Sequence, residues 1–208
     1  MIIEMIQQQK GLFDADFTFC RRGETIGDYY VQGSLGTMES SSSGTFLNRS
    51  FSLEYAAGKV FKTKKGKHRP YQIKESGMLK GEICLINRKV GWLRYRSFYA
   101  LNYGDHFYEA YAIGIGKETK TLIFDQNVQI AQIDKELTVY DDLHHFVLYI
   151  KEEQHAAVAL YFACYLYVYG CFQSGVEVKK SVVKSYAKTT NKDLLAKYDP
   201  DWACEIKE

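Results

Sequence analysis

The feature that most constrains the fold is an uncharged run of 17 residues from Ala156 to Phe172. As a helix it would be about 25 Å long at 1.5 Å per residue, which is the short limit for crossing a bilayer. Four tyrosines, at positions 161, 165, 167 and 169, lie within the run instead of forming an interfacial belt. A helix that is apolar on every side also suits burial within a protein. We therefore expect a buried central helix over 155–172 and no transmembrane segment.

The rest of the chain has the pattern of short strands. Its 208 residues include 17 Tyr and 12 Phe but only two Pro, a composition that favours strands. From residue 45 to 150, apolar and aromatic runs recur about every ten residues and are separated by Gly, Asn and Asp turn signals. Alternation is clearest in four segments: 81–86, 90–101, 128–133 and 145–150. This rhythm predicts a mainly β fold, either a meander, a sandwich or a barrel.

The length fits one domain with a small appendage. We expect the domain to span residues 1–175, with a flexible serine-rich loop at 36–44. Residues 176–208 form a lysine-rich tail, with a short helix expected over 191–198 that stops before Pro200.

Charge and cysteine content favour a cytoplasmic protein without a strong general attraction to nucleic acid. The formal net charge is only +2, so any electrostatic partner must be recognised locally. The five cysteines are scattered and odd in number, which is typical of reduced thiols in a reducing compartment. The first residues lack the long apolar stretch of a secretory signal. We expect a cytoplasmic location, with peripheral attachment to a membrane as an alternative.

Two segments carry a resemblance to a known superfamily. Ile123–Lys135 forms a strand pair with a turn at Asp125-Gln-Asn127, and Asp141–Ile150 supplies the strand that precedes the apolar helix. This arrangement resembles the tubby C-terminal domain superfamily, which includes the LURP-one-related proteins and the phospholipid scramblases. The resemblance covers about Tyr71 to Phe172. It implies a closed barrel of about twelve strands around a buried helix. It also implies noncatalytic roles such as phosphoinositide binding, although the long tail departs from the family pattern.

The densest positive charge lies between residues 59 and 69. Its six cations are Lys59, Lys62, Lys64, Lys65, Lys67 and Arg69. Each cation near an anionic membrane contributes about 1 kcal/mol, so this segment is the candidate site for an anionic ligand. The alternative is a solvated hairpin loop whose charge prevents edge-to-edge pairing.

Other candidate residues have plainer explanations. The basic and aromatic side chains of 88–99 would suit a nucleic-acid groove, but strand alternation accounts for them equally well. His144 and His145 would point to opposite faces of a strand and so chelate a metal poorly. His106 with Glu109 fits a surface pair, and Cys164 with Cys171 fits small core residues.

No catalytic motif, metal site or cofactor motif stands out. The function expected from the sequence is a noncatalytic module that binds an anionic lipid or a protein partner through the basic segment. One alternative is an enzyme or small-ligand carrier whose site is assembled from distant residues. A third is a toxin, immunity or structural interaction protein.

Overall fold

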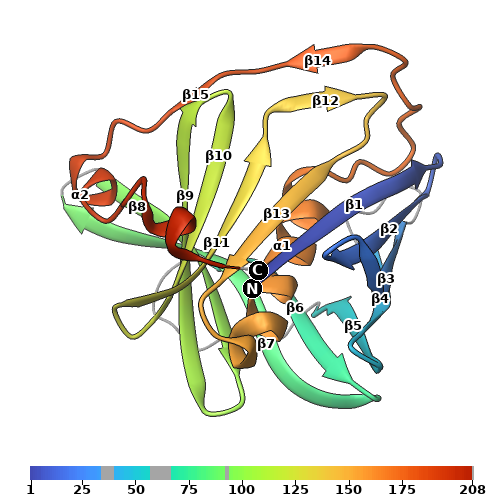
Figure 1. Cartoon of the computed structure of the whole chain (residues 1–208), viewed down its shortest axis with the longest axis horizontal. Coiled ribbons are helices and arrows are strands. Elements are labelled where there is room, and N and C mark those ends of the chain that lie inside the picture. The colour runs from blue at the N-terminus through green and yellow to red at the C-terminus, as the bar shows by residue number, and fades with distance from the viewer. Residues whose placement is uncertain (34–39, 57–66, 92–93, 208) are drawn as a thin grey trace.

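The computed structural model describes residues 1–33, 40–56, 67–91 and 94–207. Within these ranges, twelve antiparallel strands form a closed barrel, in which β13 lies between β11 and β1, and β9 pairs with β10 (Figure 1). The strands of the barrel are β1 Ile2–Lys10, β2 Asp14–Arg21, β3 Glu24–Gly33, β4 Ser40–Phe46, β5 Arg49–Tyr55, β6 Lys67–Glu75, β7 Met78–Gly91, β8 Arg94–Tyr103, β9 His106–Gly116, β10 Glu118–Asp125, β11 Val128–Glu136 and β13 His145–Ile150. The prediction of a closed barrel of about twelve strands is confirmed.

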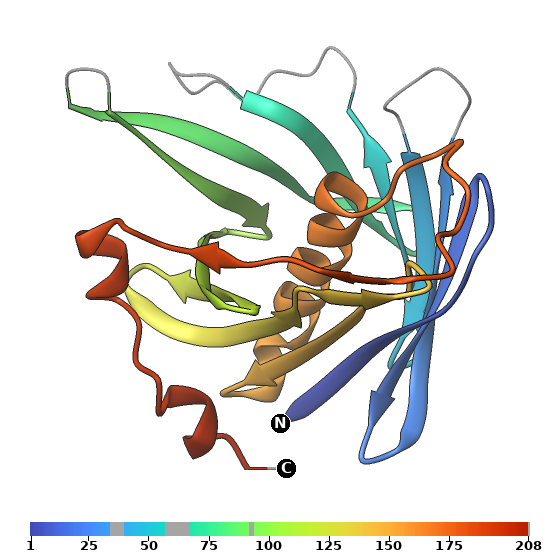
Figure 2. The same ribbon diagram turned by 90° about the horizontal axis from the view of Figure 1, so that it is seen from above.

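Helix α1, Ala156–Gly170, lies inside the barrel (Figure 2). It follows the 3₁₀ turn η1, Glu153–His155. Eleven of its 15 residues are buried, so the helix is covered on all sides by the strands. The expected central helix over 155–172 is therefore present, with slightly narrower bounds. No helix in the described part of the chain has the length and apolar character needed to cross a membrane.

The tyrosines of α1 explain how so aromatic a helix is tolerated in a core. The Tyr161 ring packs on Phe51 and the Tyr167 ring packs on Phe17, with ring centroids 5.5 and 4.5 Å apart. Their hydroxyls are also paired: Tyr161 donates to the Glu75 carboxylate at 2.5 Å, and Tyr167 accepts from the Gln7 amide at 3.1 Å. Each ring thus contributes apolar area while its polar tip keeps a hydrogen bond.

The serine-rich stretch corrects one prediction. Residues 40–44 belong to strand β4 and do not form a loop, whereas 36–39 lie outside the described residues. The strand alternates, with Ser40 and Ser42 buried on its inner face. The Tyr29 hydroxyl donates to Ser42 at 2.9 Å, and the Ser40 and Tyr71 hydroxyls lie 3.0 Å apart. Small polar residues can therefore face this core because two tyrosines satisfy their hydroxyl groups.

The tail runs over the outside of the barrel. Its elements are β14 Val182–Lys184, β15 Ala187–Lys188, α2 Lys192–Leu195 and the 3₁₀ turn η2 Trp202–Glu205. β14 pairs with the short strand β12, Thr138–Tyr140, and β15 pairs with β9. Leu194 of α2 packs on an apolar cluster formed by the outer faces of β7 to β10. The helix expected over 191–198 is present but shorter, beginning after the Asn191 cap, whose side chain accepts from two backbone amides.

Candidate functional site

A cavity of about 400 Å³ lies inside the barrel beside the last turn of α1. We call this the Gly170 end of the barrel and the opposite end the Ala156 end. The cavity is bounded by strands β9, β10, β11 and β13, by the end of α1 and by the first part of the tail. Its volume falls in the range of roughly 300–1,000 Å³ that is typical of small-molecule sites. Ala112 is exposed although β9 directs it inward, which shows that solvent reaches the cavity.

Strand alternation arranges the lining in levels. β11 runs toward the Gly170 end, so Ile133, Lys135 and Leu137 follow one another upward along the same wall. Ile133 joins Phe146 of β13 and Leu166 of α1 in an apolar floor. The level of Lys135 is polar. Above it, apolar side chains of the tail face those of the β11–β13 connection: Leu137, Val139, Val176 and Val183.

A β-bulge brings a lysine into this polar level. The register between β1 and β2 shifts between Gln7 and Gln9. Regular alternation after inward Gln7 would direct Gln9 inward and Lys10 outward, but the extra residue reverses this phase. The Lys10 side chain is accordingly only 6% exposed, and its ammonium lies 3.6 Å from the Asp142 carboxylate.

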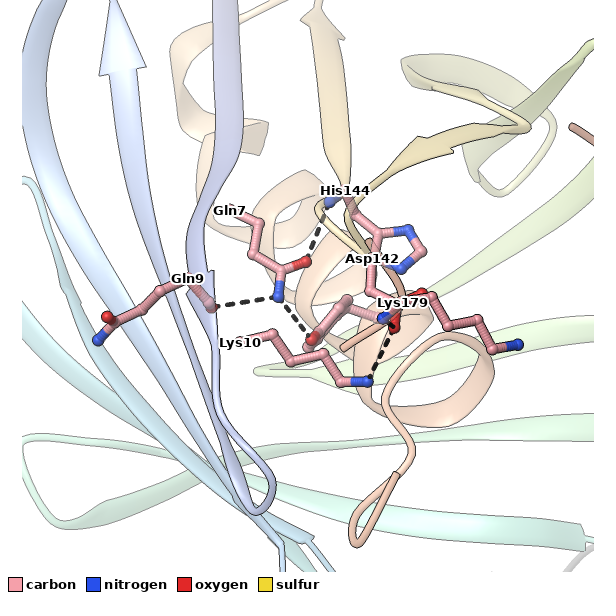
Figure 3. A network of polar contacts seen from close by, with 7 residues as sticks. Gln7, Gln9, Lys10, Asp142, His144 and Lys179 are labelled. Atoms are coloured by element: carbon pink, nitrogen blue, oxygen red, sulfur yellow. Dashed lines mark hydrogen bonds and ion pairs between the residues drawn. The ribbon is translucent and has the colours of Figure 1, made fainter. Parts of the chain in front are cut away.

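A hydrogen-bond network joins four parts of the chain around this lysine (Figure 3). The Gln7 amide donates to the Tyr167 hydroxyl and accepts from the His144 backbone amide at 3.0 Å. Asp142 accepts from the backbone amide of Lys179 at 2.9 Å as well as pairing with Lys10. The network therefore fixes β1, α1, the segment before β13 and the tail relative to one another (Figure 3).

The electrostatics of the cavity favour an anion. Among the described residues, three lysines line it, Lys10, Lys135 and Lys179, against one carboxylate, that of Asp142. Burial lowers the pKa of His144 to about 4, with nearby Lys135 acting in the same direction, so this imidazole is neutral at pH 7. Its Nδ1 atom is buried and has no hydrogen-bond partner among the described residues. The cavity thus carries more positive than negative charge.

Two further cavities lie at the Ala156 end. A polar cavity of about 450 Å³ is lined by His106, Asp125 and His155, and His106 Nδ1 lies 3.2 Å from the Asp125 carboxylate. A third cavity, of about 320 Å³, includes Glu75, whose carboxylate accepts from Tyr103 and Tyr161. Across the described ranges, no three His, Cys, Asp or Glu side chains are grouped so that they could hold a metal ion.

The basic segment predicted as the anionic site falls outside what can be described. Lys59, Lys62, Lys64 and Lys65 lie outside the described residues, and so do the side chains of Lys67 and Arg69. The flanking strands are informative, however. β5 ends and β6 begins at the Gly170 end of the barrel, because β6 runs from there to Glu75 beside Tyr161.

The other candidates from the sequence are separated by the fold. His144 packs on Tyr167, whereas His145 lies outside and contacts Glu4 at 3.0 Å. His106 pairs with Asp125 and not with Glu109.

The remaining predicted groups have structural roles. Burial raises the pKa of the Cys164 and Cys171 thiols, which suits inert residues. Arg88 and Arg96 contact Glu109 and Asp193 on the outer surface.

The cavity at the Gly170 end was not predicted from the sequence. Its groups come from positions 10, 135, 142, 144 and 179, which no local motif connects. One signal was available: Lys135 occupies the position in β11 where alternation after Ile133 calls for an apolar residue. Lys10 gave no such signal, because the bulge that turns it inward has no distinctive sequence.

Comparison with protein-family models, with curated proteins and with solved structures finds no significant match. The resemblance to the tubby superfamily therefore rests on the pattern of Ile123–Lys135 and Asp141–Ile150 and stays a prediction.

Proposed function

We propose that this protein is a noncatalytic binding module that holds a small molecule in the cavity at the Gly170 end. The observation that carries the proposal is the combination, in one cavity, of an apolar floor with a few converging polar groups. That combination is the usual composition of ligand sites in proteins. It corresponds to the small-ligand carrier that the sequence left as an alternative.

The chemistry of the lining supports binding over catalysis. His144, with its pKa lowered to about 4, is a poor general base at neutral pH because efficient bases titrate near the operating pH. Burial raises the pKa of the Cys171 thiol, whereas a nucleophilic cysteine needs a lowered one. Lys10 and Asp142 neutralise each other in an ion pair.

A second candidate partner is an anionic lipid surface or a protein that contacts Lys59–Arg69. It is favoured by the position of the flanking strands, which places this segment's two attachment points at the same end of the barrel as the cavity. Peripheral attachment to the cytoplasmic face of a membrane would suit both features. The scattered cysteines, odd in number, support a reducing compartment.

A substitution at Gly170 tests the cavity. A Cβ at this position meets nothing within 4 Å, and it would share a helix face with Leu166, which lines the cavity. Gly170→Leu is therefore expected to fill space without a clash, while the gain in helix propensity of about 1 kcal/mol supports folding. Gly170→Ala is the matched control, because it adds only one methyl group.

The readout is saturable fluorescence of N-phenyl-1-naphthylamine, a neutral apolar probe, at equal protein concentration. We expect binding to the natural chain and to Gly170→Ala, and at least a tenfold loss of binding in Gly170→Leu, with a thermal stability no lower than that of the natural chain. Equal binding to all three proteins would remove the cavity as the site.

A further inference from the structure

The lining of the cavity also specifies the chemistry of its occupant. Its floor consists of Ile133, Phe146 and Leu166, with Ala112 on β9 and Thr121 on β10 beside them. Apart from the Thr121 hydroxyl, these side chains offer an apolar surface on which a polar ligand would lose its water without compensation. The part of the ligand that reaches the floor must therefore be mainly hydrocarbon.

The part of the cavity above this floor is polar and positively charged. Lys135 projects from the inner face of β11, and its ammonium lies 5.7 Å from the centre of the Phe146 ring, at the edge of the apolar floor. The Lys135 ammonium donates to the backbone carbonyl of Glu136 at 3.3 Å, but no carboxylate matches its charge. In the described part of the chain, neither Lys135 nor Lys179 has an acid within ion-pair distance. Cations in such partly buried positions are normally paired.

His144 lines the cavity at the same level. Its ring stacks on Phe146, with the centroids 6.4 Å apart, and its unpartnered Nδ1 atom is shielded from water. Because this nitrogen has no exposed surface, it faces the protein interior and not the open space of the cavity. An anionic group beside Lys135 would therefore take its favourable contact from the ammonium.

The volume limits how much hydrocarbon can enter. At about 400 Å³ the cavity is near the small end of the range for ligand sites, so it suits a single chain and excludes the two acyl chains of a phospholipid.

We infer that the occupant is a single-chain amphiphile with one anionic head group, whose tail lies on the floor of Ile133, Phe146 and Leu166 and whose head contacts Lys135. The inference rests on the proposed function, since it names the ligand class of the same cavity. The head is a carboxylate or a phosphate monoester, both of which present oxygen acceptors to an ammonium.

The test compares four dodecyl probes on the full chain by isothermal titration calorimetry. These probes are dodecanoate, dodecyl phosphate, dodecanol and dodecyltrimethylammonium, each kept below the concentration at which it aggregates. We expect at least one anionic probe to bind roughly tenfold or more tightly than dodecanol, since a charge-assisted hydrogen bond contributes a factor of that order. The cationic probe should bind most weakly. Whichever anion binds better identifies the source of the head group.

Lys135→Met locates the head, because it removes the charge and keeps the length of the side chain. We expect this substitution to weaken the binding of the anionic probe roughly tenfold and to leave the binding of dodecanol unchanged. Lys151→Met, which makes the same charge change at the Ala156 end, should alter neither.

The possible failures are distinct. Equal binding of dodecanol and both anions, all of it lost in Gly170→Leu, would overturn the anionic head and leave the cavity as a binding site. Binding that Gly170→Leu does not affect would overturn both proposals.

Discussion

His144 should make the stability of this protein depend on pH in a window that its surroundings define. The pKa of the imidazole is about 4 in the folded chain, against an ordinary value of 6.5. Between these values the unfolded chain binds a proton that the folded chain excludes. The free energy of unfolding therefore rises with pH through this window. The contribution of the neutral His144 ring is fully present above about pH 6.5 and is lost as the pH falls toward 4.

The size of the effect follows from the shift. Each pKa unit corresponds to about 1.4 kcal/mol, and allowing for the partial exposure of the ring we expect about 2 to 3 kcal/mol. The cause is the burial of the ring between Phe146 and Tyr167, strengthened by Lys135.

His144→Phe isolates this contribution, because phenylalanine keeps an aromatic ring against Phe146 and Tyr167 but does not titrate. Urea denaturation followed by circular dichroism, repeated from pH 7.5 to pH 4, gives the unfolding free energy of both proteins. The natural chain should lose about 2 to 3 kcal/mol relative to His144→Phe as the pH falls. Carboxylates that titrate in the same range cancel in this difference.

His145→Gln is the matched control. His145 lies on the outer surface and contacts Glu4. The difference in unfolding free energy between the natural chain and His145→Gln should therefore change by less than about 1 kcal/mol over the same pH range. If the unfolding free energies of the natural chain and His144→Phe differed by the same amount at every pH, the reasoning would be refuted.

Two further changes test how the barrel is held together. Glu75→Leu should destabilise the fold by about 2 kcal/mol or more in urea denaturation, because it leaves the Tyr103 and Tyr161 hydroxyls without their acceptor. Adding Tyr161→Phe should recover part of that loss, and a further loss would contradict the explanation. Leu194→Asp should free the tail and speed trypsin cleavage at its lysines, because the new carboxylate would lie on the apolar outer cluster. Leu195→Asp, one residue away and 38% exposed in the natural chain, should leave cleavage unchanged, and equal cleavage of both variants would count against docking through Leu194.

The parts of the fold that sequence reasoning predicted are those with a regular period. The apolar run at 156–172 corresponds to α1, and the alternating segments at 81–86, 90–101, 128–133 and 145–150 correspond to strands of the barrel. Each of these signals is local, because burial on one side or on all sides determines which neighbouring residues in the sequence are apolar.

The missed parts depend on contacts between distant residues. Ser40 and Ser42 have the composition of a loop, and only Tyr29 and Tyr71 on other strands make them acceptable in a core. Lys10 reaches the cavity through a bulge, whose position depends on the pairing of β1 with β2. The cavity itself forms only where strands, the end of α1 and the tail meet, and the periodicity of a single sequence does not reveal such long-range contacts.

The closure of the barrel has a consequence for how the chain is made. β13 pairs with β1, so residues 145–150 must meet residues 2–6 before the ring is complete, and α1 follows β13 directly. A ribosome releases the N-terminal strand first, and that strand keeps one open edge until the twelfth strand has emerged. Pairings this distant in sequence are slow to form. The unfinished sheet therefore presents an unpaired edge and an aromatic inner face throughout most of its synthesis, which makes this interval the time of greatest risk for aggregation.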